Sequence, residues 1–207
     1  MSPPRPAVAD LVLATGNRGK RAEFAALLSR HGLRLASLAD FPDVPLPEEG
    51  DDYRANAAVK ARTVAVATGL PALADDSGIE VEALGGRPGP RSARYGGAAL
   101  DDRGRCARLL AELAATGDTA RRARFVCEAA LARPDGSVVH GFGECRGRIL
   151  DAPRGAGGFG YDPIFEPEGH TVSMAELPEA TKNEISHRAR ALAALAEALA
   201  ALRPARW

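Results

Sequence analysis

Residues 8–28 read VADLVLATGNRGKRAEFAALL, and this stretch decides the fold that the sequence predicts. The apolar run from Val8 to Ala14 is typical of a buried β-strand. It leads directly into Thr15-Gly16-Asn17-Arg18-Gly19-Lys20, and a helical spacing of Phe24, Leu27 and Leu28 follows. The stretch therefore predicts a strand, a glycine loop and a helix, in that order.

The loop between this strand and helix has the chemistry of an anion site, although it is not a Walker A motif. That motif has four residues between its glycines and a Ser or Thr after its lysine. Here two residues separate Gly16 from Gly19, and Arg21 follows Lys20. Glycine amides and a helix N-terminus still direct partial positive charge at an anion, and Lys20 adds a full charge. The alternative is an ordinary strand-to-helix turn.

Further along the chain, helical and strand-like patterns are mixed. The sequence predicts a helix over residues 52–68 and a second helix over 187–202. Between them, residues 71–74 are typical of a buried strand, which ends in Asp75-Asp76-Ser77-Gly78. Acidic side chains at the end of a strand are well placed for chemistry.

Two longer strand-like runs, 124–132 and 137–149, flank the turn sequence Pro134-Asp135-Gly136, which predicts a hairpin. Because hairpin-joined and helix-joined strands occur together, we expect an α/β protein with a mixed sheet. The length of 207 residues fits one domain, residues 1–207, which could form two lobes that share a core.

Charge and composition exclude several classes of protein. The 27 basic side chains balance 27 acidic ones, so no overall basic field attracts nucleic acid or an anionic membrane. No apolar run approaches the roughly 20 residues of a membrane span, and the N-terminus lacks the layout of a signal peptide. Cys106, Cys127 and Cys145 are odd in number and form no CxxC pattern, which argues against disulfides or zinc. We expect a cytoplasmic protein.

Lysine is rare in this chain. Of its 27 basic residues only Lys20, Lys60 and Lys182 are lysines, and the others are arginines. Arginine prefers bidentate partners, whereas lysine is a compact point charge that can contact a single phosphate oxygen. The three lysines therefore suggest one anion-binding site, unless a biased composition left them by accident.

A glycine-rich segment occurs late in the chain. Gly155, Gly157 and Gly160 satisfy GxGxxG, but that fingerprint should open a helix after the first strand of a βαβ unit, and Tyr161-Asp162-Pro163 follows here instead. The context of the glycines therefore argues against a dinucleotide-binding fold. Phe159 and Tyr161 either offer flat faces to a nucleotide base or are core aromatics inside a glycine-rich loop.

The carboxylates allow a magnesium site. Magnesium binds one or two carboxylates together with substrate phosphates. Asp75 and Asp76 are adjacent at a strand end, so their side chains should point to opposite sides and one of them should face a given site. Glu48 and Glu49 supply further carboxylates, and the alternative is that all of these are solvated loop charges.

The motif Ser186-His187-Arg188 begins a helix. Because the chain has no GxSxG elbow, this motif does not predict a serine hydrolase.

Taken together, these segments resemble the inosine triphosphate pyrophosphatase family. The resemblance covers almost the whole chain, and its specificity lies in the order and spacing of the motifs. They are Ala14-Thr15-Gly16-Asn17 with Lys20, Glu48 and Gly50 before Asn56-Ala57 and Lys60, Asp75-Asp76-Ser77-Gly78, Pro88-Gly89, Ser92-Ala93-Arg94-Tyr95, residues 157–165 (GGFGYDPIF), and Lys182 with Ser186-His187-Arg188.

The resemblance implies hydrolysis of ITP, dITP and XTP to the monophosphate and pyrophosphate, which removes these nucleotides from the pool. It also implies magnesium (Mg²⁺) as cofactor, a homodimer, and a twisted sheet with helices in two lobes around a nucleotide cleft. The implied catalytic residues are Asp76 and Lys60, and the implied metal ligands are Glu48 and Asp76. The implied substrate-binding residues are Thr15, Gly16, Asn17, Arg18, Gly19, Lys20, Ser77, Phe159, Gly160, Tyr161, Asp162, Lys182, His187 and Arg188.

The sequence departs from the family pattern at two places. Members often have Glu-Glu-Thr-Gly where this chain has Pro47-Glu48-Glu49-Gly50. Counting back from Gly50 selects Glu48 as the ligand, and Glu49 is a neighbour that could substitute for it. Ala55 stands where an acid is frequent, which affects no implied role.

Base selection would come from hydrogen-bond donors aimed at a 6-oxo group. His187 or Arg188 would donate to inosine or xanthine and would oppose the amino group of adenine, and a polar mismatch of this kind discriminates strongly. Three rival interpretations remain: a nucleotide sensor that cleaves nothing, an interaction protein that uses its alanine-rich C-terminal helix, and the related septum-inhibitor-like pyrophosphatases, which prefer pyrimidine or modified nucleotides.

Overall fold

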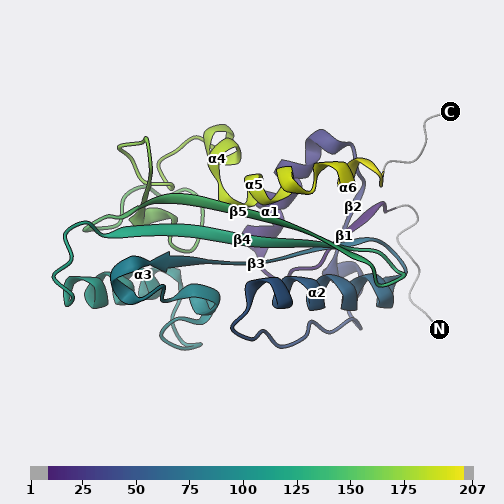
Figure 1. Cartoon of the computed structure of the whole chain (residues 1–207), viewed down its shortest axis with the longest axis horizontal. Coiled ribbons are helices and arrows are strands. Elements are labelled where there is room, and N and C mark those ends of the chain that lie inside the picture. Colours follow the sequence, from purple (N-terminus) through teal and green to yellow (C-terminus); the bar gives the residue numbers. More distant parts are fainter. Residues whose placement is uncertain (1–8, 203–207) are drawn as a thin grey trace. The chain divides into compact units, whose positions relative to one another are not determined.

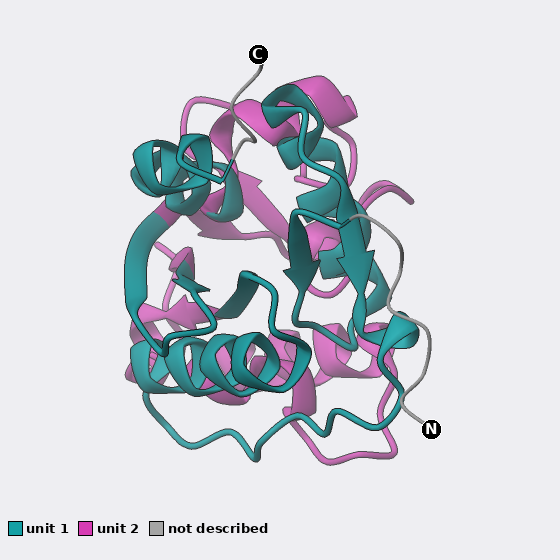
Figure 2. Ribbon diagram, turned by 90° about the vertical axis from the view of Figure 1, so that its right-hand side faces the viewer, with its two compact units in different colours: residues 1–76, 127–143, 188–207 teal, residues 77–126, 144–187 magenta. Residues whose placement is uncertain are grey.

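The computed structural model describes residues 9–202, which form two compact units. Within these residues, unit 1 comprises 9–76, 127–143 and 188–202, and unit 2 comprises 77–126 and 144–187. Each unit is therefore assembled from segments that lie far apart in the sequence, as the colours of Figure 2 show. Val8, the first residue of the predicted N-terminal strand, lies outside the described residues.

Six strands form one mixed sheet in the order β2-β1-β3-β4-β5-β6. The mixed sheet is as the sequence predicts, and Figure 1 labels strands β1 to β5. The β1 strand pairs in parallel with β2 and with β3, whereas β5 and β6 are antiparallel. The strands are β1 Leu11–Leu13, β2 Leu35–Ser37, β3 Ala72–Val81, β4 Arg122–Ala132, β5 Val138–Ile149 and β6 Phe165–Pro167.

Six α-helices accompany the sheet within the described residues. They are α1 Arg18–Leu28, α2 Tyr53–Thr68, α3 Asp102–Ala114, α4 Glu179–Ile185, α5 His187–Ala194 and α6 Ala196–Ala200. No helix in residues 9–202 is both long enough and apolar enough to cross a membrane.

The ends of the first two long helices follow from local capping. Asn17 precedes α1, and its side chain accepts a hydrogen bond from the backbone of Lys20. Asp52 caps α2 in the same way, and Gly69 ends that helix in the left-handed conformation at φ 69°. The predictions of helices after the glycine loop and over residues 52–68 are confirmed.

In unit 1, the alternation of side chains along β1 and β3 produces two apolar clusters. Leu13 and Leu73 pack with Phe24 of α1 and with Leu192 and Leu195 near the C-terminus. The intervening residues Val12, Ala14, Ala72 and Ala74 form a second cluster with Ala57 and Ala61 of α2. Because successive residues of a strand point to opposite faces, α1 and α2 cover different faces of these strands.

Unit 2 has its own apolar core. Leu109 and Leu113 of α3 pack with Ile79 and Val81 of β3. The aromatic rings of Phe125 and Phe165 meet edge to face in the same cluster, with centroids 4.7 Å apart. The two ends of β3 thus belong to different cores, because the strand runs from unit 1 into unit 2 at Asp76.

Two predictions about elements need correction. The strand predicted over 71–74 continues to Val81, so Asp75 and Asp76 lie inside β3 and not at its end. It is the neighbouring strand, β1, that ends before the acids, at Leu13 opposite Leu73. The single C-terminal helix is also interrupted: the backbone N–H of Leu195 bonds to the carbonyl oxygen of Leu192, which tightens one turn between α5 and α6.

The predicted hairpin is formed by β4 and β5, which are neighbours in the sheet. Its turn closes where the backbone N–H of Arg133 donates to the carbonyl oxygen of Ser137 at 2.9 Å. Gly136 adopts φ 85° there, a conformation that suits glycine and disfavours other residues.

Candidate active site

The glycine loop lies where β1 ends and α1 begins, in unit 1. The backbone N–H of Asn17 donates to the Thr15 hydroxyl at 3.2 Å, and Asn17 Oδ1 accepts from the backbone N–H of Lys20 at 3.0 Å. Arg18 and Gly19 form the first turn of α1. The first turn of a helix has N–H groups without an intrahelical acceptor, so this loop can bind an anion through its backbone.

Asp75 lies on the face of β3 that meets α1, and cations surround its carboxylate. Lys20 Nζ is 3.0 Å from Asp75 Oδ2, and Arg188 Nε is 3.4 Å from the same oxygen. The Asp75 side chain is completely buried, and burial raises the pKa of a carboxyl group. The charges of Lys20, Arg188 and Lys60 outweigh that effect and hold the pKa of Asp75 well below its ordinary value. Asp75 is therefore a buried carboxylate that holds Lys20.

Asp76 points to the opposite face of β3, as the strand periodicity predicts. Its Oδ2 accepts a hydrogen bond from Asn56 Nδ2 at 2.7 Å, and its Oδ1 lies 4.0 Å from Lys60 Nζ. Burial raises the pKa of Asp76 above its ordinary value, and Lys60 and Asn56 oppose that shift. A carboxylate in this environment is suited to accept a proton.

Lys60 connects α2 to both acids of β3. Its Nζ donates to the backbone oxygen of Asp75 at 2.7 Å and forms an ion pair with Glu49. Glu49 is thus the carboxylate that the structure places beside Lys60 and Asp76, whereas Glu48 is exposed to solvent. The alternative weighed for this loop, in which Glu49 substitutes for Glu48, gains support from these contacts.

Asn56 organises this group, although the sequence alone assigns it no role. Its side chain exchanges two hydrogen bonds with Gly50, at 2.8 and 3.0 Å, in addition to its bond to Asp76. The amide therefore ties the Glu48–Gly50 loop to the acid on β3. The signal in the sequence was an asparagine on the same helix face as Lys60, four residues before it.

Glu23 is a second residue that the sequence analysis missed. Its Oε2 accepts from Arg188 Nη1 at 2.9 Å, and each of the two side chains is 6% exposed. Arg188 therefore bridges Glu23 of α1 and Asp75 of β3. The available signal was an acidic residue next to Phe24, on the face of α1 that is otherwise apolar.

These carboxylates suit a magnesium ion that is bound together with substrate. No group of three or more His, Cys, Asp or Glu side chains in residues 9–202 could hold a metal by itself. A hard cation that keeps waters and binds phosphate oxygens needs only one or two carboxylates. Asp76 with Glu49 or Glu48 supplies that number, so the residues present fit the predicted ion.

In unit 2, Asp162 anchors the glycine-rich loop. Its Oδ2 accepts from the backbone N–H of Phe159 at 2.9 Å and from Lys182 Nζ at 2.7 Å. The Lys182 ammonium also lies 5.2 Å from the centre of the Phe159 ring. Gly158 has φ 70°, and a Cβ atom there would lie 2.0 Å from Asp162 Oδ2, so this position requires glycine.

The two aromatic residues of this loop have different environments. Tyr161 is 5% exposed and packs in the core of unit 2, where its hydroxyl donates to the backbone oxygen of Ser92 at 2.9 Å. Burial raises the pKa of the Tyr161 hydroxyl above its ordinary value. These contacts support the core-aromatic alternative for Tyr161, and Phe159 is left as the ring that can face a base.

His187 and Ser77, the remaining predicted residues of unit 2, are both buried. The His187 ring stacks on Phe125, with centroids 4.8 Å apart and planes 10° apart. Ser77 directly follows Asp76 on β3. Phe125 was not selected from the sequence, although it lies in a predicted strand, because nothing local indicates which residue of another element its ring meets.

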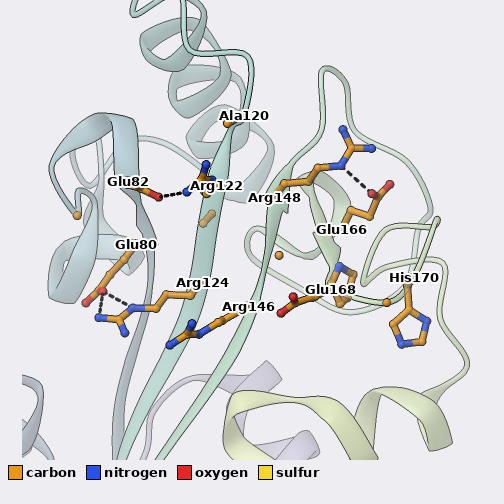
Figure 3. A pocket seen from close by; sticks show the side chains of 15 residues that line it. Glu80, Glu82, Ala120, Arg122, Arg124, Arg146, Arg148, Glu166, Glu168 and His170 are labelled. Carbon is orange, nitrogen blue, oxygen red and sulfur yellow. Dashed lines mark hydrogen bonds and ion pairs between the residues drawn. The ribbon is translucent and has the colours of Figure 1, made fainter.

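A pocket of about 710 Å³ in unit 2 lies apart from these residues, and none of the predicted site residues lines it (Figure 3). Its arginines are paired with glutamates: Arg124 with Glu80 at 2.8 Å and Arg148 with Glu166 at 2.7 Å. The cations of this pocket are thus paired with carboxylates of the same unit.

The fold and these groups define an α/β protein whose first loop and neighbouring lysines are suited to a polyphosphate. A model of the Ham1 family matches residues 11–198, and the chain belongs to this family.

Relatives and solved structures agree with this assignment. The chain is 50% identical over 190 residues to a dITP/XTP pyrophosphatase of Geobacter sulfurreducens, covering 91% of this chain and 96% of the relative. A protein of the same name from Deinococcus deserti is 52% identical over 187 residues, covering 90% and 87%. The structure resembles a HAM1 protein from Coxiella burnetii with a TM-score of 0.82 and 42% identity, covering 91% of this chain and 97% of the other.

Proposed function

We propose that this protein hydrolyses the triphosphates of non-standard purines, ITP, dITP and XTP, to the monophosphate and pyrophosphate. The relatives named dITP/XTP pyrophosphatase support this substrate class. The observation that carries the proposal is the group around β3, where Lys20 and Lys60 meet Asp75 and Asp76 beside a helix N-terminus. This group combines the cations that a polyphosphate needs with a carboxylate that can accept a proton.

The triphosphate binds to the loop from Thr15 to Lys20. Backbone N–H groups at the start of α1 point toward an anion, and the helix dipole adds to their effect. Lys20 supplies a full charge, and its ion pair with Asp75 fixes the position of the ammonium group before substrate arrives. Preorganised charge of this kind stabilises phosphoryl oxygens without reorganisation during the reaction.

The reaction adds water at the α-phosphorus and breaks the bond to the β-phosphate oxygen. Asp76 accepts a proton from the attacking water, and Asn56 holds the carboxylate in place through its 2.7 Å hydrogen bond. Lys60 stabilises charge near the reacting phosphates. Asp76 with Glu49 or Glu48 would hold magnesium, which when bound supplies positive charge to the phosphate oxygens.

The base is selected by residues of unit 2 and the start of α5. Phe159 offers the face of its ring, and Ser77, Gly160 and Asp162 belong to the same proposed binding set. Lys182 adds positive charge for the triphosphate. His187 or Arg188 donates a hydrogen bond to the 6-oxo group of inosine or xanthine. Adenine presents an amino group at that position, so a buried donor faces another donor and binding is lost.

A homodimeric state is proposed on the family resemblance alone. A cytoplasmic location is proposed from the three cysteines, which form no CxxC pattern, and neither nucleic acid nor a membrane is proposed as a partner. The balanced charge of 27 basic and 27 acidic residues supports the exclusion of nucleic acid.

The proposal is tested by measuring products from ITP, dITP, XTP, ATP, GTP and the pyrimidine triphosphates. We expect pyrophosphate, not inorganic phosphate, with the first three substrates, and a loss of activity in EDTA that magnesium restores. A protein that binds ITP and releases no pyrophosphate would instead be a nucleotide sensor. Preference for a pyrimidine triphosphate would favour the septum-inhibitor-like class.

A further inference from the structure

Both backbone polar groups of Gly160 are held by side chains of α3. The Gly160 N–H donates to Asp102 Oδ2 at 2.8 Å, and the Gly160 carbonyl oxygen accepts from Cys106 Sγ at 3.3 Å. Asp102 and Cys106 are four residues apart, so they project from the same face of the helix. All three residues belong to unit 2.

The two side chains are suited to these roles. Asp101 caps α3 by accepting from the backbone N–H of Gly104 at 2.8 Å, so Asp102 is not needed as the cap. Cys106 is 3% exposed, and burial, with a smaller effect of Asp102, raises the pKa of its thiol to about 12. The thiol therefore keeps its hydrogen and remains a donor throughout the pH range in which enzymes work.

Gly160 differs from Phe159 and Tyr161 because its backbone is held by side chains of α3. Phe159 is held through its backbone by Asp162, and Tyr161 is held through its hydroxyl by Ser92. Gly160 adopts φ 61°, and a Cβ atom there would meet no other atom within 4 Å, so close packing does not hold it. The contacts from α3 therefore set the orientation of the peptide groups that follow Phe159.

We propose that Asp102 and Cys106 are positioning residues that hold the Gly160 backbone and thereby orient Phe159 for the purine base. This inference rests on the proposed function, in which Phe159 faces the base. Neither residue touches substrate. They act on base affinity and on discrimination between bases, since a small displacement of a binding group has a large effect.

The test compares Asp102→Ala with Asp102→Asn, which retains an acceptor oxygen, and Cys106→Ala with Cys106→Ser, which retains a donor. Asp101→Ala is the matched control, because it removes the adjacent carboxylate and the helix cap but leaves the Gly160 contacts intact. For Asp102→Ala we expect the KM for ITP to rise about tenfold, the effect of losing one charge-assisted hydrogen bond. The kcat should stay within about twofold, since no reacting group is altered.

Asp102→Asn and Cys106→Ser should restore most of the KM and of the ITP to ATP preference. Asp101→Ala should lower Tm and leave KM unchanged. Amide hydrogen exchange gives a readout without substrate: exchange at Gly160 should accelerate in Asp102→Ala and stay slow in Asp101→Ala. The Asp102 side chain is 56% exposed and also pairs with Arg105 at 3.2 Å, so the Tm of each Asp102 variant is measured beside its KM.

Two results would overturn the inference. The first is an unchanged KM and base preference in both Asp102→Ala and Cys106→Ala. The second is a KM that rises as Tm falls in every variant, including the Asp101→Ala control. Failure of the proposed function is recognised separately, because the unaltered protein would then release no pyrophosphate from ITP. The exchange rate at Gly160 would still report whether α3 holds the loop.

Discussion

Two adjacent acids on β3 have different partners and therefore different roles. Asp75 is enclosed by Lys20 and Arg188, whereas Asp76 bonds to Asn56 and lies 4.0 Å from Lys60. The two side chains lie on opposite faces of the sheet because consecutive residues of a strand alternate between its faces. Replacing each acid by its amide therefore distinguishes a structural carboxylate from a catalytic one.

We expect Asp76→Asn to lose nearly all pyrophosphate release and to keep its stability, because the amide oxygen can still accept from Asn56. Asp75→Asn should lower the free energy of unfolding by about 3 kcal/mol or more, since it leaves the buried cations Lys20 and Arg188 without their carboxylate. Urea unfolding and a turnover assay on both variants measure the two effects. Substantial turnover in Asp76→Asn would remove Asp76 from the reaction.

The two glutamates before Gly50 are also distinguished by their neighbours. Glu49 pairs with Lys60, and Glu48 faces solvent. We expect Glu49→Gln to raise the magnesium concentration for half-maximal activity severalfold, with a smaller change in Glu48→Gln. Magnesium titration of both variants is the measurement, and the reverse order would assign the metal role to Glu48, as the family pattern implies.

At the scale of elements, the glycine-rich loop depends on a close approach between its own residues. A methyl group at Gly158 would lie 2.0 Å from Asp162 Oδ2 and would displace the carboxylate that holds Phe159 and Lys182. We expect Gly158→Ala to lower Tm and to raise the KM for ITP.

Gly169→Ala is the control for that substitution. Gly169 has a similar backbone conformation, with φ 82°, but a Cβ atom there would meet nothing within 4 Å. Thermal melts and steady-state kinetics on both variants separate backbone strain from the steric contact. Equal effects in the two would show that the contact with Asp162 is unimportant.

Local signals in the sequence were sufficient for most elements. The α2 helix begins after Asp52 and ends at Gly69 because a cap and a left-handed glycine act within a few residues. The extent of β3 could not be predicted in the same way. Asp75, Asp76 and Ser77 are poor strand formers, and the strand continues through them in the sheet between β1 and β4.

At the scale of the whole molecule, the proposed substrate-binding residues belong to both compact units. Thr15 to Lys20 lie in unit 1, and Phe159 to Asp162 lie in unit 2. If one nucleotide binds to both sets, a non-hydrolysable ITP analogue should slow amide exchange in both segments. Bound at a hundredfold excess over its Kd, it should also stabilise the protein by about 2.7 kcal/mol.

Hydrogen exchange followed by mass spectrometry measures this protection segment by segment. The β5 strand, Val138–Ile149, which contributes no proposed ligand contact, is the internal reference. Protection in only one of the two segments would mean that the other set of residues does not bind this nucleotide.

The sequence by itself determined several of the longer strands and helices, the mixed sheet and the residue types of the site, but not β2, β6, α3 or α4. Periodicity, caps and turn residues act over a few positions, so they can be identified without tertiary structure. The tertiary structure decided which charges meet. Arg188 pairs with Glu23 across 165 positions, and Asp102 reaches Gly160 across 58. Strand alternation places the Asp75 and Asp76 side chains on opposite faces of β3. Their partners depend on which helix packs its apolar side against each face. Packing of Phe24 of α1 and of Ala57 of α2 decides which helix covers which face, and no local sequence pattern predicts it.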